Sequence, residues 1–452
     1  MRNRDFVLIF FCAFLVRLIN LLTIDNLESF SFIEDSQMYW DIGLCINDVG
    51  DFCRVTHEGI RPETERVPLY PLFLAAHLHS FALALPSVLL SQAILDSMNA
   101  VLVALLGSRF GSKVGICVGF IYTISHNFIL HSSLILPETF TLFLFLLFVL
   151  LTLNVRTFTI HSSFGWVVFG CAMGVLGGLL ILSKIVLQFM VLATMAYGVF
   201  SISKNSHRLL YLITFCLGMA MCLAPLLERN INRFGAYSLS SQSGTHALFW
   251  VLGNCISLNE GSSFSSVSKP LKKSFYDDLS SKGIEPAEVS PFELSSLKFN
   301  YAANEAIDLD VDVIFKCWVF GAAKNLVAPS YLLDQRIRKY NLGSFYESSG
   351  DGLFEKVRRF LFDNHWVYTS GFVIGSIGSS IWVSLAFVGV FMTPRKLRMD
   401  VFFFVSVIGL FLLVSGPVGG AKYRIFFEPF LTILGVVGAL NIYSSLKKYR
   451  LS

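Results

Sequence analysis

Residues 137–154 read PETFTLFLFLLFVLLTLN, a run with the length and the apolar character of a membrane-spanning helix. Similar runs recur along the 452-residue chain, which is 54% hydrophobic and 15% charged, with a mean hydropathy of +0.64. A bilayer core needs about 20 mostly apolar residues for each spanning helix. The sequence therefore predicts an all-α polytopic membrane protein, and its composition argues against a soluble α/β fold.

Ten apolar runs are predicted to span the membrane. They cover residues 6–23, 87–106, 114–132, 137–154, 164–182, 185–202, 209–226, 370–392, 400–416 and 425–443. The first is interpreted as a retained helix because it lacks the small-residue cleavage site of a secretory signal. Two more apolar stretches, residues 67–85 and 311–333, are interrupted by prolines, histidines or lysines. Both are predicted to lie at the outer membrane surface instead of crossing the bilayer.

The distribution of basic residues sets the predicted orientation. If residues 67–85 do not cross, every cytoplasmic end is basic. The residues that gather there are Arg2, Arg4, Arg109, Lys113, Arg156, Lys204, Arg208, Arg395, Lys396, Arg398, Lys447, Lys448 and Arg450. Both termini are therefore predicted to be cytoplasmic. The net charge is only +4, and it is the distribution of Lys and Arg that indicates the orientation. No basic stripe with interleaved aromatics lies outside the apolar runs, so nucleic acid is not an expected partner.

This topology divides the chain into six parts. They are the first transmembrane helix (1–23), a first outer loop with membrane-surface helices (24–86), transmembrane helices two to seven (87–226), a large outer loop region (227–369), transmembrane helices eight to ten (370–443) and a cytoplasmic tail (444–452). The second outer region is long enough for a small domain.

Four cysteines fall in the predicted outer loops. Cys45 and Cys53 share the first loop, and Cys255 and Cys317 share the second. An oxidising compartment permits a disulfide in each. The pair Cys45 and Cys53 is favoured because both lie in one short segment, where a bridge would brace the residues after Asp35. The alternative is two free thiols.

Carboxylates in the first outer loop are candidates for proton transfer. Glu34 and Asp35 are adjacent, and Tyr39, Trp40 and Asp41 follow them. A carboxylate beside a membrane surface loses solvation, which can suit it to acid–base chemistry. The alternative is a solvated loop charge or a helix cap.

Glu138 opens the fourth predicted span at its outer end. A functional role would place it in the same outer cavity as Asp35, whereas a structural role would be a favourable first helical turn. Arg17, inside the first span, is costly in lipid and is expected to face the helix bundle, with a carboxylate partner that the sequence does not identify.

Several cations are predicted to lie at the outer ends of spans, against the prevailing charge bias. They are Arg66, Arg229, Lys422 and Arg424, with Asn230 beside Arg229 and Tyr70 following Arg66. Such cations suit a phosphate that remains attached to a lipid. The alternative is snorkelling to the headgroups, and for Lys184 that interpretation is favoured.

Signals for soluble nucleotide or metal chemistry are weak. The sequence contains no GxxxxGK[ST] phosphate loop, no HExxH, no GxSxG and no Cys or His set at zinc spacing. His57, His77 and His79 give only a faint metal signal. No cofactor is predicted, and a divalent metal stays open.

In order along the chain, these features resemble the membrane glycosyltransferases of the GT-C superfamily, in the branch of the protein O-mannosyltransferases and the lipid A aminoarabinose transferases. The matching elements are Asp35 and Tyr39, the Arg66 to Pro71 segment, Glu138, Arg229-Asn230, and Lys422 to Arg424. Where that family often has Asp-Glu, this chain has Asp35-Ser36 preceded by Glu34, so Glu34 stays a second candidate base. Where it has Arg-Pro after the fifth span, this chain has Lys184-Ile185.

The resemblance implies transfer of a sugar from a polyprenyl-phosphate donor to a hydroxyl of an acceptor protein, lipid or glycan. Asp35 would be the general base, with Glu138 supporting it and Tyr39, Tyr70 and Asn230 lining the site. Arg229 and Arg424 would bind the donor phosphate, with Lys422 and Arg66 behind them. The expected location is a bacterial inner membrane, with membrane lipids around the chain and the site on the periplasmic side.

Two other classes of function compete with this interpretation. A transporter or flippase of a lipid-linked or small polar substrate would place ionisable groups near the bilayer midplane, often in two related halves. The ionisable groups here concentrate at the outer rim, and no half repeats the other. A non-catalytic scaffold would leave Asp35 and the rim cations without a role.

Overall fold

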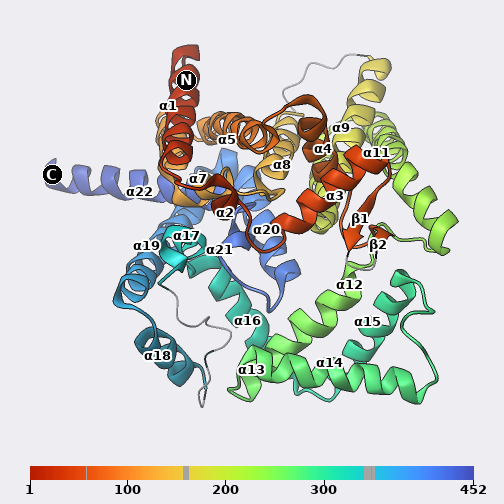
Figure 1. Cartoon of the computed structure of the whole chain (residues 1–452). Helices are drawn as coiled ribbons and strands as arrows, with labels where there is room; N and C mark the ends of the chain where they lie inside the picture. Colours follow the sequence, from red (N-terminus) through yellow and green to blue (C-terminus); the bar gives the residue numbers. More distant parts are fainter. Residues whose placement is uncertain (57–58, 156–161, 341–347, 349–351, 452) are drawn as a thin grey trace. The chain divides into compact units, whose positions relative to one another are not determined.

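The computed structural model describes residues 1–56, 59–155, 162–340, 348 and 352–451. Within these residues the chain is built almost entirely of helices (Figure 1), and strands β1 and β2 pair in a two-stranded sheet. The chain divides into two compact units. Unit 1 comprises Met1–Leu226, Ile381–Leu410 and Ile425–Ser452, and unit 2 comprises Leu227–Ser380 and Phe411–Arg424.

Most elements belong to one unit. Those of unit 1 are α1 (Asn3–Leu22), α2 (Leu27–Ser31), α3 (Ser36–Val49), β1 (Cys53–Thr56), β2 (Gly59–Pro62), α4 (Leu69–Ser80), α5 (Ala84–Ser108), α6 (Ser112–Ile124), α7 (His126–His131), α8 (Glu138–Leu153), α9 (Ser163–Ser183), η1 (Ile185–Leu187), α10 (Gln188–Ser201), η4 (Arg395–Leu397) and α22 (Glu428–Leu451). Those of unit 2 are α12 (Gln242–Thr245), η2 (His246–Leu252), α13 (Gly253–Asn259), α14 (Phe264–Ser281), α15 (Pro291–Ile307), α16 (Val311–Val327), η3 (Ser330–Leu333), α17 (Gln335–Arg338), α18 (Leu353–Asp363) and α21 (Ala421–Arg424). Three helices run through a unit boundary: α11 (Asn205–Phe234), α19 (Trp366–Met392) and α20 (Arg398–Ser415).

The chain is an integral membrane protein, as its composition predicts. Within the described residues, seven helices are long and apolar enough to cross a bilayer: α1, α5, α9, α11, α19, α20 with η4, and α22. Three shorter apolar helices, at Ser112–Ile124, Glu138–Leu153 and Ile185–Ser201, overlap the remaining predicted spans. The all-α polytopic fold is therefore confirmed, while the count of ten spans stays a prediction.

Two predicted runs differ in their detail from the helices observed. Residues 114–132 do not form one helix, because α6 ends at Ile124 and α7 begins at His126, with Ser125 in an extended conformation between them. Helix α11 continues through Pro225 to Phe234, beyond the predicted end at residue 226. The predicted large outer region, residues 227–369, therefore begins inside a helix.

The two interrupted apolar stretches form short helices. Helix α4 has 12 residues, so it is about 18 Å long, against about 30 Å for a bilayer core. Its prolines, Pro68 at the N-cap and Pro71 in the first turn, occupy positions where a missing N–H costs no helical hydrogen bond. Helix α16 has 17 residues and ends before Pro329. Their position at a membrane surface stays a prediction.

A buried ion pair lies among α1, α5 and α6 of unit 1. The Nε atom of Arg17 lies 2.8 Å from Oδ2 of Asp96, and both side chains are fully buried. The Tyr122 hydroxyl donates to Oδ1 of Asp96 at 2.5 Å, and Arg17 also donates to the Thr123 carbonyl at 2.5 Å. Asp96 is thus the partner that the sequence did not identify, and the pair lets two charged groups exist among spanning helices.

Unit 2 has an apolar core of its own. Its buried members are Leu248, Leu252, Leu271, Phe275, Leu279 and Ala302. A disulfide joins Cys255 on α13 to Cys317 on α16 across 62 residues of chain. Helices α14 and α15 lie between the two cysteines along the chain, and the apolar core and the disulfide together hold them in place.

Candidate functional site

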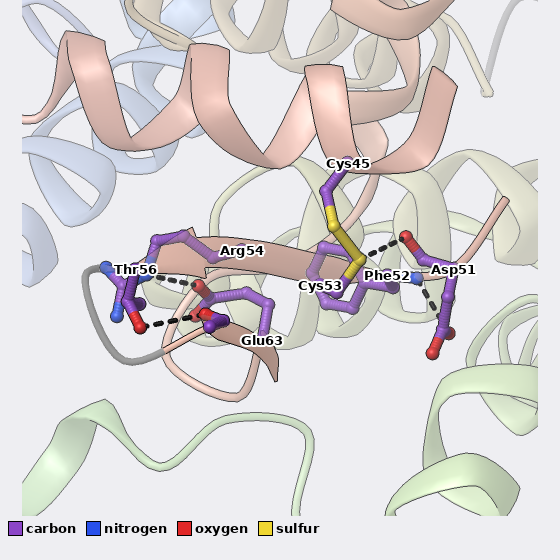
Figure 2. Close-up of a disulfide and its surroundings, with 8 residues drawn as sticks. Cys45, Asp51, Phe52, Cys53, Arg54, Thr56 and Glu63 are labelled. Atoms are coloured by element: carbon purple, nitrogen blue, oxygen red, sulfur yellow. Dashed lines mark hydrogen bonds and ion pairs between the residues drawn. A yellow bond between two sulfur atoms is a disulfide. The ribbon is translucent and has the colours of Figure 1, made fainter. Parts of the chain in front are cut away.

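A second disulfide lies in the predicted first outer loop. Cys45, near the end of α3, is bonded to Cys53, which begins β1, and their Cα atoms are 5.6 Å apart (Figure 2). Strand β1 pairs with β2 in antiparallel register, so that Cys53 faces Pro62. The bridge therefore ties helix α3, which follows Asp35, to the hairpin that leads to Arg66.

Glu63 fixes the segment between the hairpin and Arg66. Its carboxylate is buried, and Oε1 accepts hydrogen bonds from the backbone N–H groups of Thr64, Glu65 and Arg66 at 3.0, 2.7 and 2.9 Å. Arg54 lies beside the other oxygen, with Nε 3.6 Å from Oε2 (Figure 2). Glu63 was not among the predicted site residues, because its only signal in the sequence is an acidic residue three positions before Arg66.

Arg66 and Asp35 form an ion pair. Nη2 of Arg66 lies 3.1 Å from Oδ1 of Asp35, and the guanidinium carbon lies 5.7 Å from the centre of the Tyr39 ring. Burial opposes the charge of Arg66, but Tyr39, Asp35, Glu65 and Glu63 together raise its pKa above the ordinary value. Arg66 is 10% exposed and Asp35 is 39% exposed. The arginine thus holds the Asp35 carboxylate on one side, while part of that carboxylate stays exposed to solvent.

Glu34 forms a strained turn directly before Asp35. Its φ of 49° is the only positive φ of a non-glycine residue in the described part of the chain. The left-handed conformation costs roughly 1–2 kcal/mol for such a residue. Strain of this kind often occurs at functional sites. The turn is closed by Ser36, whose hydroxyl accepts from the Ile33 N–H at 3.1 Å, and it sets Asp35 at the start of α3.

An aromatic and amide chain lies behind Asp35. Tyr39 and Tyr70 meet edge to face with ring centres 5.5 Å apart. The Tyr70 hydroxyl donates to Oε1 of Gln92 at 2.8 Å, and the Gln92 amide donates to the carbonyls of Ser132 and Leu134. Burial, with the charge of Glu138, raises the pKa of Tyr70 well above its ordinary value, so its hydroxyl stays a neutral donor. These contacts connect α3, α4 and α5 rigidly.

Glu138 is paired with Lys184. The Lys184 ammonium lies 2.6 Å from Oε1 of Glu138 and 5.3 Å from the centre of the Phe426 ring. The Glu138 side chain is 1% exposed and that of Lys184 is 23% exposed. The interpretation of Lys184 as a snorkelling residue is therefore wrong, because its charge turns inward to a buried carboxylate.

The predicted phosphate ligands of unit 2 are held by different elements. Arg229 donates to the Asn230 side chain at 2.9 Å, and its guanidinium carbon lies 5.8 Å from the Phe234 ring centre. Arg424, mostly buried, donates to the Leu326 carbonyl at 3.1 Å and to the Ser379 hydroxyl at 3.4 Å. Lys422 lies two residues before Arg424 on α21. Each arginine is thus fixed within its own surroundings.

Two further lysines of unit 2, Lys324 and Lys356, were not among the predicted site residues. Burial, with the charge of Lys356, lowers the pKa of Lys324 to about 7. Lys356 is itself buried and donates to the Ser257 hydroxyl at 3.3 Å and the Ser262 carbonyl at 3.1 Å. Lys324 was regarded only as a break in an apolar stretch. Nothing in the sequence brings it near Lys356, which lies 32 positions later.

Metal coordination receives no support from the geometry. Among the residues that the structure describes, no three His, Cys, Asp or Glu side chains lie close enough to hold a metal ion. Both ring nitrogens of His77 have protein partners, the Phe73 carbonyl at 2.8 Å and the Ser91 hydroxyl at 2.9 Å. His57 lies outside the described residues.

Comparison with known proteins gives matches only at the level of structure. No protein-family model matches the sequence, and no curated protein matches it significantly. The oligosaccharyltransferase of Archaeoglobus fulgidus in its apo form matches with a TM-score of 0.53 and 11% identity, over 99% of this chain and 51% of that chain. This chain thus spans about half the length of the protein it matches.

Two further solved structures complete the comparison. The oligosaccharyltransferase AglB from Archaeoglobus fulgidus, in complex with an inhibitory peptide and a dolichol-phosphate, matches with a TM-score of 0.53 and 13% identity, again over 99% and 51% of the two chains. ArnT from Cupriavidus metallidurans gives a TM-score of only 0.36 with 14% identity, over 90% and 73%, too low to support an argument. The chain therefore shares its fold with the oligosaccharyltransferase of Archaeoglobus fulgidus, and the GT-C-like fold that the resemblance implied is confirmed.

Proposed function

We propose that this protein transfers a sugar from a polyprenyl-phosphate donor to an acceptor hydroxyl at the extracytoplasmic face of the membrane. The observation that carries the proposal is Asp35, a solvent-reached carboxylate held by Arg66 in a disulfide-braced loop. A fold shared with an oligosaccharyltransferase that has been captured with dolichol-phosphate supports a lipid-phosphate donor. The acceptor class stays open among protein, lipid and glycan.

The proposed reaction is a direct displacement. The Asp35 carboxylate removes the proton of the acceptor hydroxyl while that oxygen bonds to the anomeric carbon of the donor sugar. The bond between this carbon and the phosphate oxygen breaks, and its electron pair leaves with polyprenyl phosphate. Phosphate is a good leaving group when cations stabilise its charge, a role assigned to Arg229 and Arg424 with Lys422. Asp35 then returns its proton to water.

Arg66 takes a different role from the one the resemblance suggested. Because its guanidinium already pairs with Asp35 and lies over Tyr39, it orients the base instead of binding the donor phosphate. Glu138 and Lys184 stabilise the protein behind Tyr70 and Gln92. Asp35 is thus the residue that contacts substrate, and the groups around it position its carboxylate.

The proposed location is the inner membrane of a bacterium, with both termini cytoplasmic and the site periplasmic. The distribution of basic residues and the positive-inside rule support this orientation. Both disulfides join cysteines of the predicted outer regions, as expected in an oxidising compartment.

The decisive experiment compares two neighbouring carboxylates. Transfer from a radiolabelled polyprenyl-phosphate sugar is measured in membranes for wild type, Asp35→Asn and Glu34→Gly. Loss of a general base lowers the rate by typically 10²–10⁴-fold, so Asp35→Asn should be nearly inactive. Glycine accepts the φ of 49° without strain, so Glu34→Gly should keep the turn and most of the activity.

The two variants also separate the candidate bases from each other. Full activity of a folded Asp35→Asn protein would refute the base assignment. Inactive Glu34→Gly with active Asp35→Asn would transfer the role to Glu34. If no polyprenyl-phosphate sugar serves as a donor for the wild type, the proposed reaction itself is wrong.

A further inference from the structure

A pocket of 380 Å³ opens in unit 2, apart from the residues assigned to catalysis. Its wall is formed by the turn after α11 and by α12 and α15. The lining side chains that matter to its chemistry are Phe234, Tyr237, Ser238, Ser243, Glu293 and Ser296. The volume lies at the lower end of the range of about 300–1,000 Å³ that is typical of small-molecule sites.

Specific hydrogen bonds and ring contacts hold the walls of the pocket in place. Asn230, which is buried, donates its amide hydrogen to the Ser238 carbonyl at 2.8 Å and so holds the turn after α11. Gly235, with φ of 65°, makes that turn possible. The rings of Phe234 and Phe292 pack with centres 5.5 Å apart, which joins the turn to α15.

Close approach of α12 and α15 forms another wall. The Gly244 N–H donates to the Ser295 hydroxyl at 2.9 Å, and a Cβ at Gly244 would collide with the Ser295 carbonyl oxygen. The Ser243 and Ser295 hydroxyls lie 3.3 Å apart. Glycine at position 244 is thus required for this contact, which keeps the serine hydroxyls of both helices at the pocket.

The chemistry of the lining selects a hydroxyl-rich ligand. Serine hydroxyls both donate and accept hydrogen bonds, which matches the hydroxyls of a sugar. Glu293 is the one charged side chain of the lining residues that the structure describes, and no lysine or arginine is among them, so an anionic ligand is disfavoured. Tyr237 is 85% exposed at the edge and offers a free aromatic face for the apolar side of a sugar ring.

We propose that this pocket binds a neutral saccharide. This inference goes beyond the transfer reaction, because binding in the pocket requires neither the sugar donor nor catalysis. The pocket also differs in charge from a phosphate site, because Arg229, Lys422 and Arg424 do not line it. A saccharide held here would be recognised by its hydroxyl pattern and by stacking on Tyr237.

The test measures binding without turnover. The full-length protein is placed in phospholipid nanodiscs, because glycosidic detergents would compete for the pocket. Saturation-transfer NMR is recorded with the methyl glycosides of glucose, mannose, galactose and N-acetylglucosamine, and with methyl glucuronide as the charged counterpart. At least one neutral glycoside should receive saturation, and methyl glucuronide should receive several-fold less.

Three variants locate the binding. Tyr237→Ala should lower the saturation signal several-fold without changing the melting temperature, because the side chain is exposed. Phe299→Ala is the matched control: it removes a 51% exposed aromatic from α15 outside the pocket and should leave the signal unchanged. Glu293→Gln should raise the glucuronide signal, because it removes the repelling charge.

Several results would overturn the proposal. They are the absence of saturation of every neutral glycoside, an equal signal in wild type and Tyr237→Ala, and glucuronide binding as strong as that of the neutral sugars. Loss of the signal in Asp35→Asn would assign the binding to the transfer site instead. Sugar transfer by a protein that fails these binding tests would leave the proposed function intact and remove only the pocket.

Discussion

The pair formed by Glu138 and Lys184 gives the sharpest test of how the site is held. The carboxylate is 1% exposed, whereas the lysine side chain is 23% exposed. Removing one partner of a buried pair costs about 3–5 kcal/mol, because the other charge stays away from water. Lys184→Met should therefore cost about 3 kcal/mol of unfolding free energy or more, because the Glu138 charge cannot reach solvent.

The reverse substitution should cost less. Glu138→Gln leaves an ammonium that can turn toward water, so a loss of about 1–2 kcal/mol is expected. In the double variant Glu138→Gln/Lys184→Met no charge remains buried, and its loss should be smaller than the sum of the single losses by more than about 1 kcal/mol.

Equilibrium unfolding in nanodiscs, followed by tryptophan fluorescence, measures the three losses. A larger loss for Glu138→Gln than for Lys184→Met would refute the argument from exposure. Additive losses would show that the two charges do not depend on each other. A conservative control is Lys282→Met, which removes an exposed lysine paired with Asp278 and should change stability by less than about 1 kcal/mol.

Two other predictions concern buried charges in each unit. Arg17→Met should lower the free energy of unfolding by about 3–5 kcal/mol, and adding Asp96→Asn should recover part of this loss. If unfolding measurements instead show that the two losses add, Arg17 and Asp96 do not act as a buried pair. Burial lowers the pKa of Lys324 to about 7, so between about pH 7 and pH 10.5 this lysine is neutral in the folded protein and charged in the unfolded chain. Burying it therefore destabilises the folded state most below pH 7, where it is charged in both states, and the cost falls as the pH rises through this window. Lys324→Met should therefore raise the melting temperature and the free energy of unfolding most at pH 6. The gain in unfolding free energy over wild type should shrink toward pH 10, by at most about 1.4 kcal/mol per pH unit. A gain that stays constant or grows with pH would contradict this prediction.

The sequence predicts the fold class well because the bilayer imposes one strong requirement on every span. Continuous apolar runs such as residues 137–154 coincide with observed helices, in this case α8. The prolines and lysines in residues 67–85 and 311–333 predict that neither stretch crosses the membrane. The structure places helices α4 and α16 there, and their position at a membrane surface stays a prediction. These signals are local, because each is contained in a short stretch of sequence and does not depend on residues far along the chain.

Features that depend on distant residues could not be predicted. Residues 114–132 are apolar enough on average to be predicted as one helix, yet the helix breaks at Ser125. There Ser125 and Asn127 donate to the two carboxylate oxygens of Glu428, some 300 positions later, at 3.2 and 2.5 Å. The same limitation hid Asp96 from Arg17, and Glu138 from Lys184, since a lone charge in an apolar run does not identify the charge that stabilises it.

The choice between Glu34 and Asp35 shows what geometry adds where two residues are chemically alike. A general base must hold its carboxylate in a defined position, and rigid neighbours supply that position. Asp35 has Arg66 on its carboxylate, and Arg66 is fixed in turn by the Tyr39 ring and, through its backbone, by Glu63. Glu34 instead carries the backbone strain of the turn, with an exposed side chain. One residue thus makes the turn and the other is presented by it, which supports Asp35 as the base and gives Glu34 a structural role that glycine could fill.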